Sequence, residues 1–529
     1  MNTASRNRRI VQSTGIVMGT ILLSRILGFL REWMVAHQMG SSAITDSYYA
    51  AFTLPDFLNN LVAAGALGLV FVPVFTKYLA EDREDEAWHV FSTVMTFMTI
   101  ALGILILLGE IFTPQLVRMI APGFGPAERA HVVFLTRVML PAQLFFYLGS
   151  VMGAAQNART RFLIPALAAI VYNLGIISGG WWLSSRIGVT GFAVGLLVGT
   201  FCGFFLLQSV AIWRMGAKFK PNLDLRHPGF RLFIKLAIPL MLALSIEFTD
   251  NWMIRWFGSF LEPASITRLT YARTLMLMPL STITYAIGVA SFPFLTQMHS
   301  AGMFNELNRT MGATLKALVL CLVPISALTV VLSKPLVYLV FSHTRLKEGD
   351  FLATSVALAL FSLGMFARGA QNLISRGFNA AHDTATPAIA GTAFTFLTLP
   401  IYWYSARLWG FAGLAAASSL SIVIYAAFLF VLLIRRTGNR HASEILLCFF
   451  KVLFSSAVVA LACSRLAAWL EARLAWQTAR GALAVLTIVT VFGLPSIMLL
   501  ARLLGVTEIE TYWKRLIPWV PKRVLVAPE

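Results

Sequence analysis

Long apolar stretches recur along nearly the whole chain, and short polar segments separate them. Fourteen of these stretches reach the roughly 20 residues that a helix needs to cross the hydrocarbon core of a bilayer. The alternation of apolar and polar residues that marks an outer-membrane barrel is absent, so the pattern predicts helices. The predicted spans are 11–39, 45–77, 88–118, 131–156, 162–184, 187–214, 229–258, 264–298, 308–341, 351–376, 385–406, 408–434, 446–470 and 479–504.

Composition supports lipid as the solvent of this chain. Of the 529 residues, 58% are hydrophobic and 12% are charged, and the charged fraction is about half that of an ordinary soluble domain. The net charge of +19 would suggest a nucleic-acid partner in a soluble protein. In a membrane protein the same excess is typical of cytoplasmic loops that face anionic lipid. We therefore predict an all-α integral membrane protein with no nucleic-acid partner.

Basic residues are concentrated in alternate loops, which indicates the orientation of the chain. The richer loops contain Arg6, Arg8, Arg9, Lys77, Arg83, Arg159, Arg161, Arg214, Lys218, Lys220, Arg226, Arg309, Arg376, Arg435, Arg436, Arg440, Lys514, Arg515, Lys522 and Arg523. The opposite loops contain only Arg186, Arg345, Lys347, Arg407 and Arg473. Because positive loops stay inside, both termini are expected in the cytoplasm. The first apolar stretch has no small-residue cleavage site, so it is interpreted as a retained helix.

Two segments of the chain repeat at one constant offset in residue number. The matching pairs are Ile44 with Ile266, Thr45 with Thr267, Tyr49 with Tyr271, Ala50 with Ala272, Asn157 with Asn379, Pro165 with Pro387, Gly188 with Gly410, Gly191 with Gly413, and Arg214 with Arg436. The repeat predicts two parallel six-helix lobes, at residues 1–222 and 223–440, followed by a helix pair and a basic cytoplasmic tail at 441–529. Transporters built from such repeats commonly bind substrate between the lobes.

Catalytic groupings are absent from the sequence. There is no P-loop GxxxxGK[ST], no HExxH, and no metal or redox spacing among the four cysteines. The chain is therefore expected to be neither an ATPase nor another enzyme, and to need no cofactor. We expect an ion gradient, the membrane potential or consumption of the substrate to drive transport.

Charged residues inside the apolar spans are the candidates for function, because each costs several kcal/mol unless it faces a cavity or a partner. The first span carries Arg25, Arg31 and Glu32. The two arginines are offset by roughly 120° around a helix, so both can border one broad cavity. Asp46, at the start of the second span, is expected to counter the charge of Arg25 or Arg31. Further along that span, Pro55 predicts a kink. A structural ion pair between Arg31 and Glu32 is the alternative interpretation.

The second lobe has its own intramembrane charges. Asp250 lies in span 7, and Arg268 and Arg273 lie early in span 8. The repeat places Arg268 opposite Asp46, so one duplicated position carries opposite charges in the two lobes. Guanidinium groups bind phosphate and carboxylate groups well, so the expected ligand is an anionic head group. For Arg255 and Arg268, snorkelling to the membrane surface is the alternative.

Several short motifs are spread along the whole chain. They are Ser24-Arg25-x-x-Gly28-Phe29-x-Arg31-Glu32, Thr45-Asp46-x-Tyr48, Leu54-Pro55, Phe71-Val72-Pro73, Arg161-Phe162-x-Ile164-Pro165, Tyr271-Ala272 with Pro279, and Asp383-Thr384-x-Thr386-Pro387. Together they resemble the motifs of the MurJ/MviN family, whose members are bacterial lipid II flippases of the MOP exporter superfamily, and the resemblance covers essentially the whole chain. It implies a V-shaped fold of two six-helix lobes plus a C-terminal pair, and a function in peptidoglycan biosynthesis and cell shape.

The resemblance also implies roles for particular residues. Arg25 and Arg31 would engage the pyrophosphate of an undecaprenyl-linked precursor, which alternating access would move from the inner to the outer leaflet. Glu32 and Asp46 would help to gate the cavity. Asp250, Asn379 and Asp383 would echo a monovalent-cation site, and the last two helices would hold the lipid tail. The implied location is the bacterial inner membrane, and the implied partners are membrane lipids and cell-wall synthesis proteins.

The chain departs from the family pattern on one side of the expected cavity. Asn59 and Asn60 replace basic residues, Ala64 replaces a glutamate, and Thr274 stands where the family has an arginine, with Arg273 one residue earlier. These departures keep an exporter of another polyprenyl-linked oligosaccharide open. A MATE-like drug or cation antiporter and a membrane scaffold for cell-wall enzymes are two further interpretations.

Overall fold

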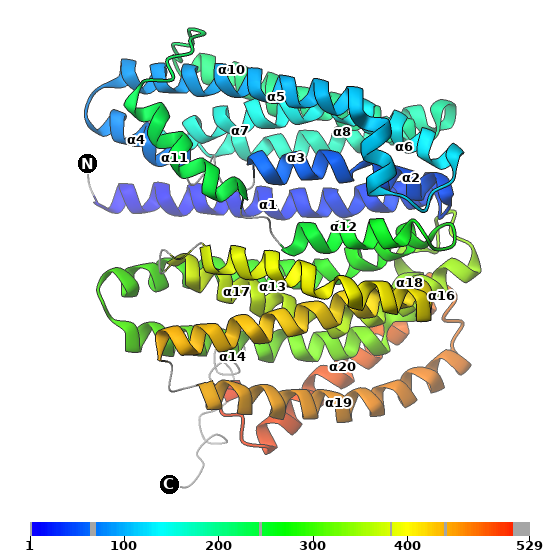
Figure 1. The fold of residues 1–529 in the computed structure, drawn as a ribbon. Coiled ribbons are helices and arrows are strands. Elements are labelled where there is room, and N and C mark those ends of the chain that lie inside the picture. The colour runs from blue at the N-terminus through cyan, green and yellow to red at the C-terminus, as the bar shows by residue number, and fades with distance from the viewer. Residues whose placement is uncertain are drawn as a thin grey trace. The chain divides into compact units, whose positions relative to one another are not determined.

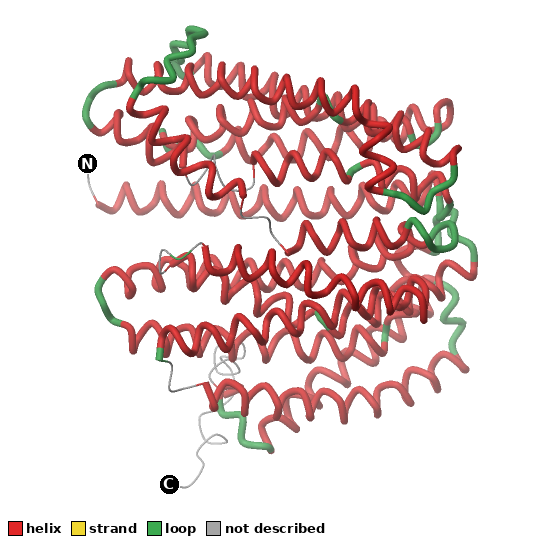
Figure 2. The backbone as a smooth tube through the Cα atoms, viewed as in Figure 1, coloured by secondary structure: helices red, strands yellow, loops and turns green. Residues whose placement is uncertain are grey.

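The structure is a computed structural model that describes residues 3–63, 70–242, 246–380, 383, 385–438 and 442–510. Throughout these residues the ordered elements are helices and no strand occurs, which confirms the all-α prediction (Figures 1 and 2). The helices are α1 (Thr3–Met39), α2 (Ala43–Ala51), α3 (Thr53–Ala63), α4 (Val72–Ala80), α5 (Glu84–Ile120), α6 (Pro126–Met139), α7 (Ala142–Ala158), α8 (Leu163–Ile187), α9 (Thr190–Thr200), the π-helix η2 (Phe201–Leu206), α10 (Leu207–Arg214), α11 (Pro228–Leu242), α12 (Ile246–Gly258), α13 (Ser265–Ser300), α14 (Phe304–Val331), α15 (Ser333–Phe341), α16 (Glu348–Leu363), α17 (Met365–Ala380), α18 (Ala385–Thr437), α19 (Ala442–Arg473) and α20 (Ala479–Leu503).

Eight helical segments in the described ranges are long and apolar enough to cross a membrane. They are Glu84–Ile120, Pro126–Ala158, Leu163–Ile187, Thr190–Arg214, Asn305–Val331, Ala385–Thr437, Ala442–Arg473 and Ala479–Leu503. Helices α16 and α17, which bend by 44° where they meet, form a ninth if they are counted as one span. The chain is thus a multi-pass membrane protein, and the total of fourteen spans stays a prediction.

The second predicted span, 45–77, is broken rather than continuous. Helix α2 ends at Ala51, Phe52 forms a turn, and α3 begins at Thr53. Pro55 explains the break, because a proline ring clashes with the carbonyl four residues earlier, here that of Ala51. The kink predicted at Pro55 is therefore confirmed. Ser42 caps the start of α2, since its hydroxyl accepts a hydrogen bond from the Thr45 amide at 3.3 Å.

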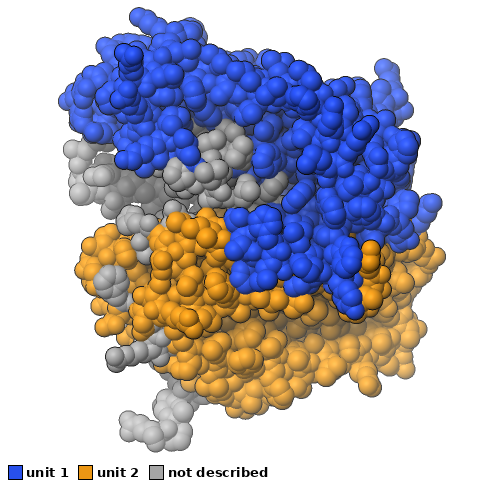
Figure 3. All heavy atoms as spheres, in the orientation of Figure 1, with its two compact units in different colours: residues 1–270, 343–347, 391–406 blue, residues 271–342, 348–390, 407–529 orange. Residues whose placement is uncertain are grey.

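Helix contacts divide the chain into two compact units, coloured separately in Figure 3. Unit 1 comprises Met1–Thr270, His343–Lys347 and Gly391–Ala406. Unit 2 comprises Tyr271–Ser342, Glu348–Ala390 and Arg407–Glu529. The lobe boundaries expected from the repeat, after positions 222 and 440, remain a prediction.

Backbone geometry recurs at the same offset as the sequence repeat. Helix α8 begins at Leu163 and α18 begins at Ala385, and these two positions are aligned by the repeat. Gly188 follows α8 with φ 60° and ψ −141°, and Gly410 interrupts α18 with φ 55° and ψ −132°. Glycine adopts such a conformation without strain, whereas a residue with a Cβ would be strained in it. The two glycines therefore make the same sharp turn in the two repeated segments.

Helices α8 and α9 of unit 1 pack with their backbones in close contact. A Cβ added to Gly175 would lie 2.3 Å from the Cα of Gly199, and one added to Gly179 would lie 2.5 Å from the Cα of Gly195. Only residues without side chains permit this approach, which membrane helices use in place of a hydrophobic driving force. The glycine stripe makes α8 a fixed support for the helix that lies beside it, α1.

In unit 2 the C-terminal helix pair packs on α14. Leu328 of α14 lies in one apolar cluster with Val459 of α19 and Val489 of α20. At one end of α14, the Lys316 ammonium group contacts the carboxylates of Glu444 at 3.2 Å and Glu508 at 2.8 Å. The pair is thus held to the rest of unit 2 by apolar packing along its length and by an ion triad at one end.

The loop before α11 is fixed by histidines and carboxylates. His89 Nε2 lies 3.2 Å from Asp224 Oδ2, and this hydrogen bond holds the pKa of Asp224 below its usual value. His227 Nδ1 accepts a hydrogen bond from the Gly229 amide at 3.1 Å, at the start of α11. Burial first, and then the neighbouring His89, lower the pKa of His227. The neutral form of His227 is therefore the one that the folded loop favours.

Candidate substrate-binding site

Helix α1 places an arginine and a glutamate side by side in unit 1. The Arg31 guanidinium donates to Glu32 Oε1 from Nη2 at 2.7 Å and from Nε at 3.2 Å. Two hydrogen bonds of this kind fix the plane of the guanidinium. The contact confirms that Arg31 and Glu32 form an ion pair, and it leaves part of the Arg31 side chain accessible, at 25% exposure. Arg25, earlier on the same helix, is half-buried.

Tyr49 of α2 completes this group, which we call the Arg31–Glu32–Tyr49 cluster. Its hydroxyl donates to the second carboxylate oxygen of Glu32, Oε2, at 2.6 Å. Glu32 is thus buried and has a partner on each oxygen. The sequence identified Arg31 and Glu32 but not Tyr49, because a tyrosine in an apolar helix is more often a packing residue.

Helix α8 adds a polar group beside α1. A Cβ added to Gly28 would lie 3.9 Å from Asn173 Oδ1. The Asn173 amide nitrogen donates to the Ala169 carbonyl at 2.8 Å, whereas Oδ1 is buried and accepts no hydrogen bond from the described residues. A buried acceptor without a donor is costly. Asn173 is therefore a candidate that the sequence did not reveal, next to the turn of α1 that separates Arg25 from Arg31.

Asp46 of α2 holds the start of α13. Its Oδ2 accepts from the Ala264 amide at 2.7 Å, and its Oδ1 accepts from the Thr267 amide at 2.7 Å and the Thr267 hydroxyl at 2.6 Å. Asp46 is buried, with 2% of its surface exposed. A carboxylate at a helix N-terminus satisfies orphan amides and complements the helix dipole. Asp46 therefore acts as a cap supplied from a distant part of the chain.

The expected pairing of Asp46 with Arg25 or Arg31 is wrong for the described residues. Both carboxylate oxygens of Asp46 bond to the first turn of α13, and Arg31 takes Glu32 as its partner instead. The physical reason is local: three well-aligned donors meet Asp46, while the residue next to Arg31 on its own helix offers a carboxylate.

Two other arginines of unit 1 also have carboxylate partners. Arg255 of α12 contacts Asp56 Oδ2 of α3 at 2.9 Å, and it reaches the Thr53 hydroxyl at 3.4 Å. Arg268, at the start of α13, pairs with the exposed Glu262 at 2.8 Å. Each of these arginine side chains is 16% exposed. Arg268 thus has a carboxylate partner near the start of α13, and both its role in a cavity and the interfacial alternative stay predictions.

The remaining predicted residues are distributed over both units. Asp250, in unit 1, is buried and accepts a hydrogen bond from the Tyr402 hydroxyl. In unit 2, Arg273 is buried, Asn379 is exposed, and Asp383 forms an ion pair with Arg436. No group of three or more His, Cys, Asp or Glu residues that could hold a metal occurs in the described ranges. The cation site at Asp250, Asn379 and Asp383 stays a prediction.

The family departures are only partly described by the structure. Asn60 is half-buried and its amide donates to the Asp56 carbonyl at 2.9 Å, so it belongs to the helix that pairs with Arg255. Asn59 is exposed. Ala64, the third departure, lies outside the described residues, as does the basic tail beyond residue 510.

Comparison with known proteins settles the family. The sequence profile described as "Lipid II flippase MurJ" matches residues 35–488, which is most of the chain. This chain belongs to the MurJ family. The matched range of the MurJ profile includes Asp46 and Asp250 and begins after Arg25, Arg31 and Glu32.

Individual members of the MurJ family are similar over most of their length. A Vibrio cholerae protein named as a probable lipid II flippase MurJ is 26% identical over 436 residues, which cover 80% of this chain and 83% of that protein. The Burkholderia cenocepacia lipid II flippase MurJ is 25% identical over 451 residues, which cover 84% and 87%. The similarity to MurJ proteins therefore extends over both repeated segments rather than over one of them.

Solved structures agree on the fold. A structure of lipid II flippase MurJ in an inward closed conformation matches with a TM-score of 0.75 at 20% identity and covers 95% of this chain and 99% of that one. An inward-facing MATE-family multidrug transporter of the MOP superfamily matches with a TM-score of 0.63 at 14% identity, over 80% and 98%. The fold is thus that of MurJ and of the MOP superfamily, as the sequence predicted.

Proposed function

We propose that this chain is a lipid II flippase, which moves an undecaprenyl-pyrophosphate-linked peptidoglycan precursor from the inner to the outer leaflet of the bacterial inner membrane. The observation that carries the proposal is the match to the MurJ profile over residues 35–488. The charged groups of α1 support it, because guanidinium groups suit the pyrophosphate that every lipid II molecule carries.

The Arg31–Glu32–Tyr49 cluster suggests how the pyrophosphate is bound and released. Before substrate arrives, Glu32 neutralises Arg31 and keeps its guanidinium oriented. A pyrophosphate carries more charge than one carboxylate, so it competes with Glu32 for Arg31 and binds Arg25 as a second cation. Tyr49 then keeps a partner on Glu32 and prevents an unpaired carboxylate in the membrane. Release restores the ion pair.

Asp46 is proposed as a gating contact. It joins α2 to the first turn of α13 through hydrogen bonds to Ala264 and Thr267. Alternating access requires contacts that form in one state and break in another. Bonds from a single side chain to a helix end can break together, which makes the contact suited to a two-state change.

We further propose that the membrane potential or a monovalent cation drives the cycle, with Asp250, Asn379 and Asp383 as the cation ligands and with no cofactor. Both termini would lie in the cytoplasm, and cell-wall synthesis proteins would be the partners that use the exported precursor. The protein would catalyse no bond-making step, since the substrate crosses the membrane unchanged.

Complementation in a bacterium depleted of its own lipid II flippase tests the proposal. The wild-type chain and Arg118→Ala, an exposed arginine outside the cluster, should restore growth and outer-leaflet lipid II. Arg31→Ala should fail while its membrane abundance is unchanged. Depletion in the natural host should accumulate lipid II in the inner leaflet. Normal lipid II flipping in depleted host cells would refute the proposal. Failure of the wild-type chain to replace the bacterium's own flippase would favour an exporter of another polyprenyl-linked oligosaccharide, which the departures at Asn59, Ala64 and Thr274 motivate.

A further inference from the structure

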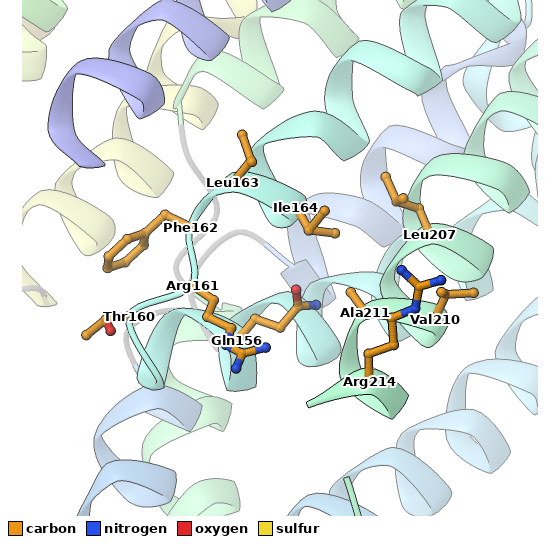
Figure 4. Close-up of a pocket in the computed structure, with 10 residues that line it drawn as sticks. All are labelled: Gln156, Thr160, Arg161, Phe162, Leu163, Ile164, Leu207, Val210, Ala211 and Arg214. Atoms are coloured by element: carbon orange, nitrogen blue, oxygen red, sulfur yellow. The ribbon is translucent and has the colours of Figure 1, made fainter. Parts of the chain in front are cut away.

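A pocket of about 440 Å³ opens in unit 1 where α7 ends, α8 begins and α10 ends (Figure 4). Two arginines line it, Arg161 from the loop before α8 and Arg214 from the last turn of α10. Its other walls are mostly apolar and include Phe162, Leu163 and Val210. The helical segment Leu163–Ile187 begins here and Thr190–Arg214 ends here, and both are long and apolar enough to cross a membrane, so we expect the pocket at the level of the membrane surface.

The two arginines carry their charge without compensation. Within the described ranges, neither the Arg161 nor the Arg214 guanidinium has a hydrogen-bond or ion-pair partner, and both residues are exposed. Many other arginines of unit 1 differ, since Arg31, Arg159 and Arg255 each contact a carboxylate. The pocket therefore concentrates positive charge that the protein itself does not neutralise.

The repeat indicates what is missing from this pocket. It aligns Arg161 with Asp383 and Arg214 with Arg436. In unit 2 those two residues form an ion pair, and Asp383 also accepts a hydrogen bond from the Thr386 amide at 3.0 Å. The first repeated segment keeps the arginine, at the end of α10, but has a second arginine, Arg161, in place of the carboxylate partner. An anion from outside the chain would compensate the positive charge of the two arginines.

Side-chain hydrogen bonds fix the floor of the pocket. Gln156 lines the pocket, is 1% exposed and donates to Gln208 Oε1 at 2.6 Å. Gln208 in turn donates to the Ile164 carbonyl at 3.1 Å. These bonds tie the ends of α7, α8 and α10 together, so the positions from which Arg161 and Arg214 project are fixed. A preorganised pair of cations binds an anion at less entropic cost than two free side chains do.

We propose that this pocket binds the phosphodiester head group of an anionic phospholipid, with the phosphate bridging Arg161 and Arg214. Guanidinium forks match phosphate oxygens, and basic pockets at the ends of membrane helices suit acidic head groups. The apolar side chains explain why a lipid is preferred over a soluble anion, because Phe162, Leu163 and Val210 are 36%, 48% and 40% exposed where an acyl chain would lie. The site is separate from the α1 cluster, and the inference does not depend on the proposed function.

The decisive variant is Arg161→Asp, which would recreate in unit 1 the aspartate–arginine pair of unit 2. The full chain is purified in a neutral detergent, and lipid binding is measured by native mass spectrometry with phosphatidylglycerol and, separately, phosphatidylcholine. The wild type should bind phosphatidylglycerol in preference. Arg161→Asp and the double variant Arg161→Ala with Arg214→Ala should bind it at least about tenfold more weakly, as expected for loss of a charge-assisted contact. Thermal unfolding checks that each variant is folded.

The controls separate this site from general electrostatic attraction. Arg226→Ala removes an exposed arginine of unit 1 that does not line the pocket, and its lipid binding should equal that of the wild type. Inorganic phosphate at millimolar concentration should not displace the lipid or raise the unfolding temperature. The inference is overturned if Arg161→Asp binds phosphatidylglycerol like the wild type, if Arg226→Ala weakens binding equally, or if inorganic phosphate stabilises the protein as well as the lipid does.

Discussion

Asp46→Asn is the substitution that most directly tests the cap on α13. It preserves the size of the side chain and removes its charge. One carbonyl oxygen remains to accept hydrogen bonds, but the other position becomes an NH₂ group. That group would face either the Ala264 amide or the two donors of Thr267, which now bond to Oδ2 and Oδ1 respectively. At least one donor therefore loses its acceptor in a buried site.

The size of the effect follows from these bonds. A hydrogen bond to a charged group contributes about 1.5–3 kcal/mol, and an N-cap about 0.5–2 kcal/mol. Losing one bond at Asp46 and the charge from the others should thus cost about 2–3 kcal/mol. Since about 1.4 kcal/mol corresponds to a factor of ten, the first turn of α13 should open about 30- to 150-fold more often.

Amide hydrogen exchange, followed by mass spectrometry of the purified protein, measures this opening. A peptide that covers Ala264–Arg268 should exchange faster in Asp46→Asn by the stated factor, and peptides from α19 should be unchanged. Asp82→Asn is the matched control, because Asp82 is exposed in the turn before α5 and takes part in no ion pair in the described residues. Unchanged exchange at Ala264–Arg268 in Asp46→Asn would refute the assignment of Asp46 as the cap.

Three further outcomes follow from other contacts. Tyr49→Phe removes the 2.6 Å bond to Glu32, so the unfolding free energy in detergent should fall by about 1–3 kcal/mol; an unchanged unfolding midpoint would contradict the cluster. Gly175→Val should lower the unfolding temperature markedly because its Cβ would meet a backbone at 2.3 Å, whereas Gly103→Val, with open space around it, should not. Burial first, and then His89, lower the pKa of His227 below its usual value of 6.5. The unfolded chain therefore binds a proton at this histidine at a higher pH than the folded chain does. The stability that neutral His227 contributes is thus complete above pH 6.5 and is lost as the pH falls through the lowered folded-state pKa. His227→Gln should flatten the decline in unfolding temperature between pH 7.5 and 5, and an equally steep decline in that variant would argue against the assignment.

The sequence predicted the features that depend on composition and local spacing. The all-α membrane fold and the break before Pro55 both follow from residues within a few positions of one another. The pairing of Arg31 with Glu32, which the sequence offered only as an alternative interpretation, is local in the same way. The family membership also rested on short motifs. The same local logic holds at Gly188 and Gly410, which the repeat aligned and which make the same backbone turn.

Contacts between distant parts of the chain were beyond the sequence pattern. Asp46 bonds to donors 218 and 221 residues away. Two of its three donors are backbone amides, and the type of a residue does not reveal that its amide will donate to a distant side chain. Electrostatic reasoning therefore assigned Asp46 to the nearest arginines. Tyr49 and Asn173 were missed for a related reason, since each is a polar group in a helix whose neighbours across the fold decide whether it packs or bonds.

The cap on α13 has a consequence for the synthesis of the protein. Asp46 and the Ala264 amide are separated by 218 residues, and at typical elongation rates of about 5–20 residues per second the ribosome needs roughly 10–40 seconds to make the intervening chain. During that interval α2 contains an aspartate whose final donors do not yet exist. Until then Asp46 must stay at the membrane surface, bind a proton or bond to another partner, and the cap itself can form only after the start of α13 has emerged. The position of one carboxylate thus sets an order of events in membrane insertion.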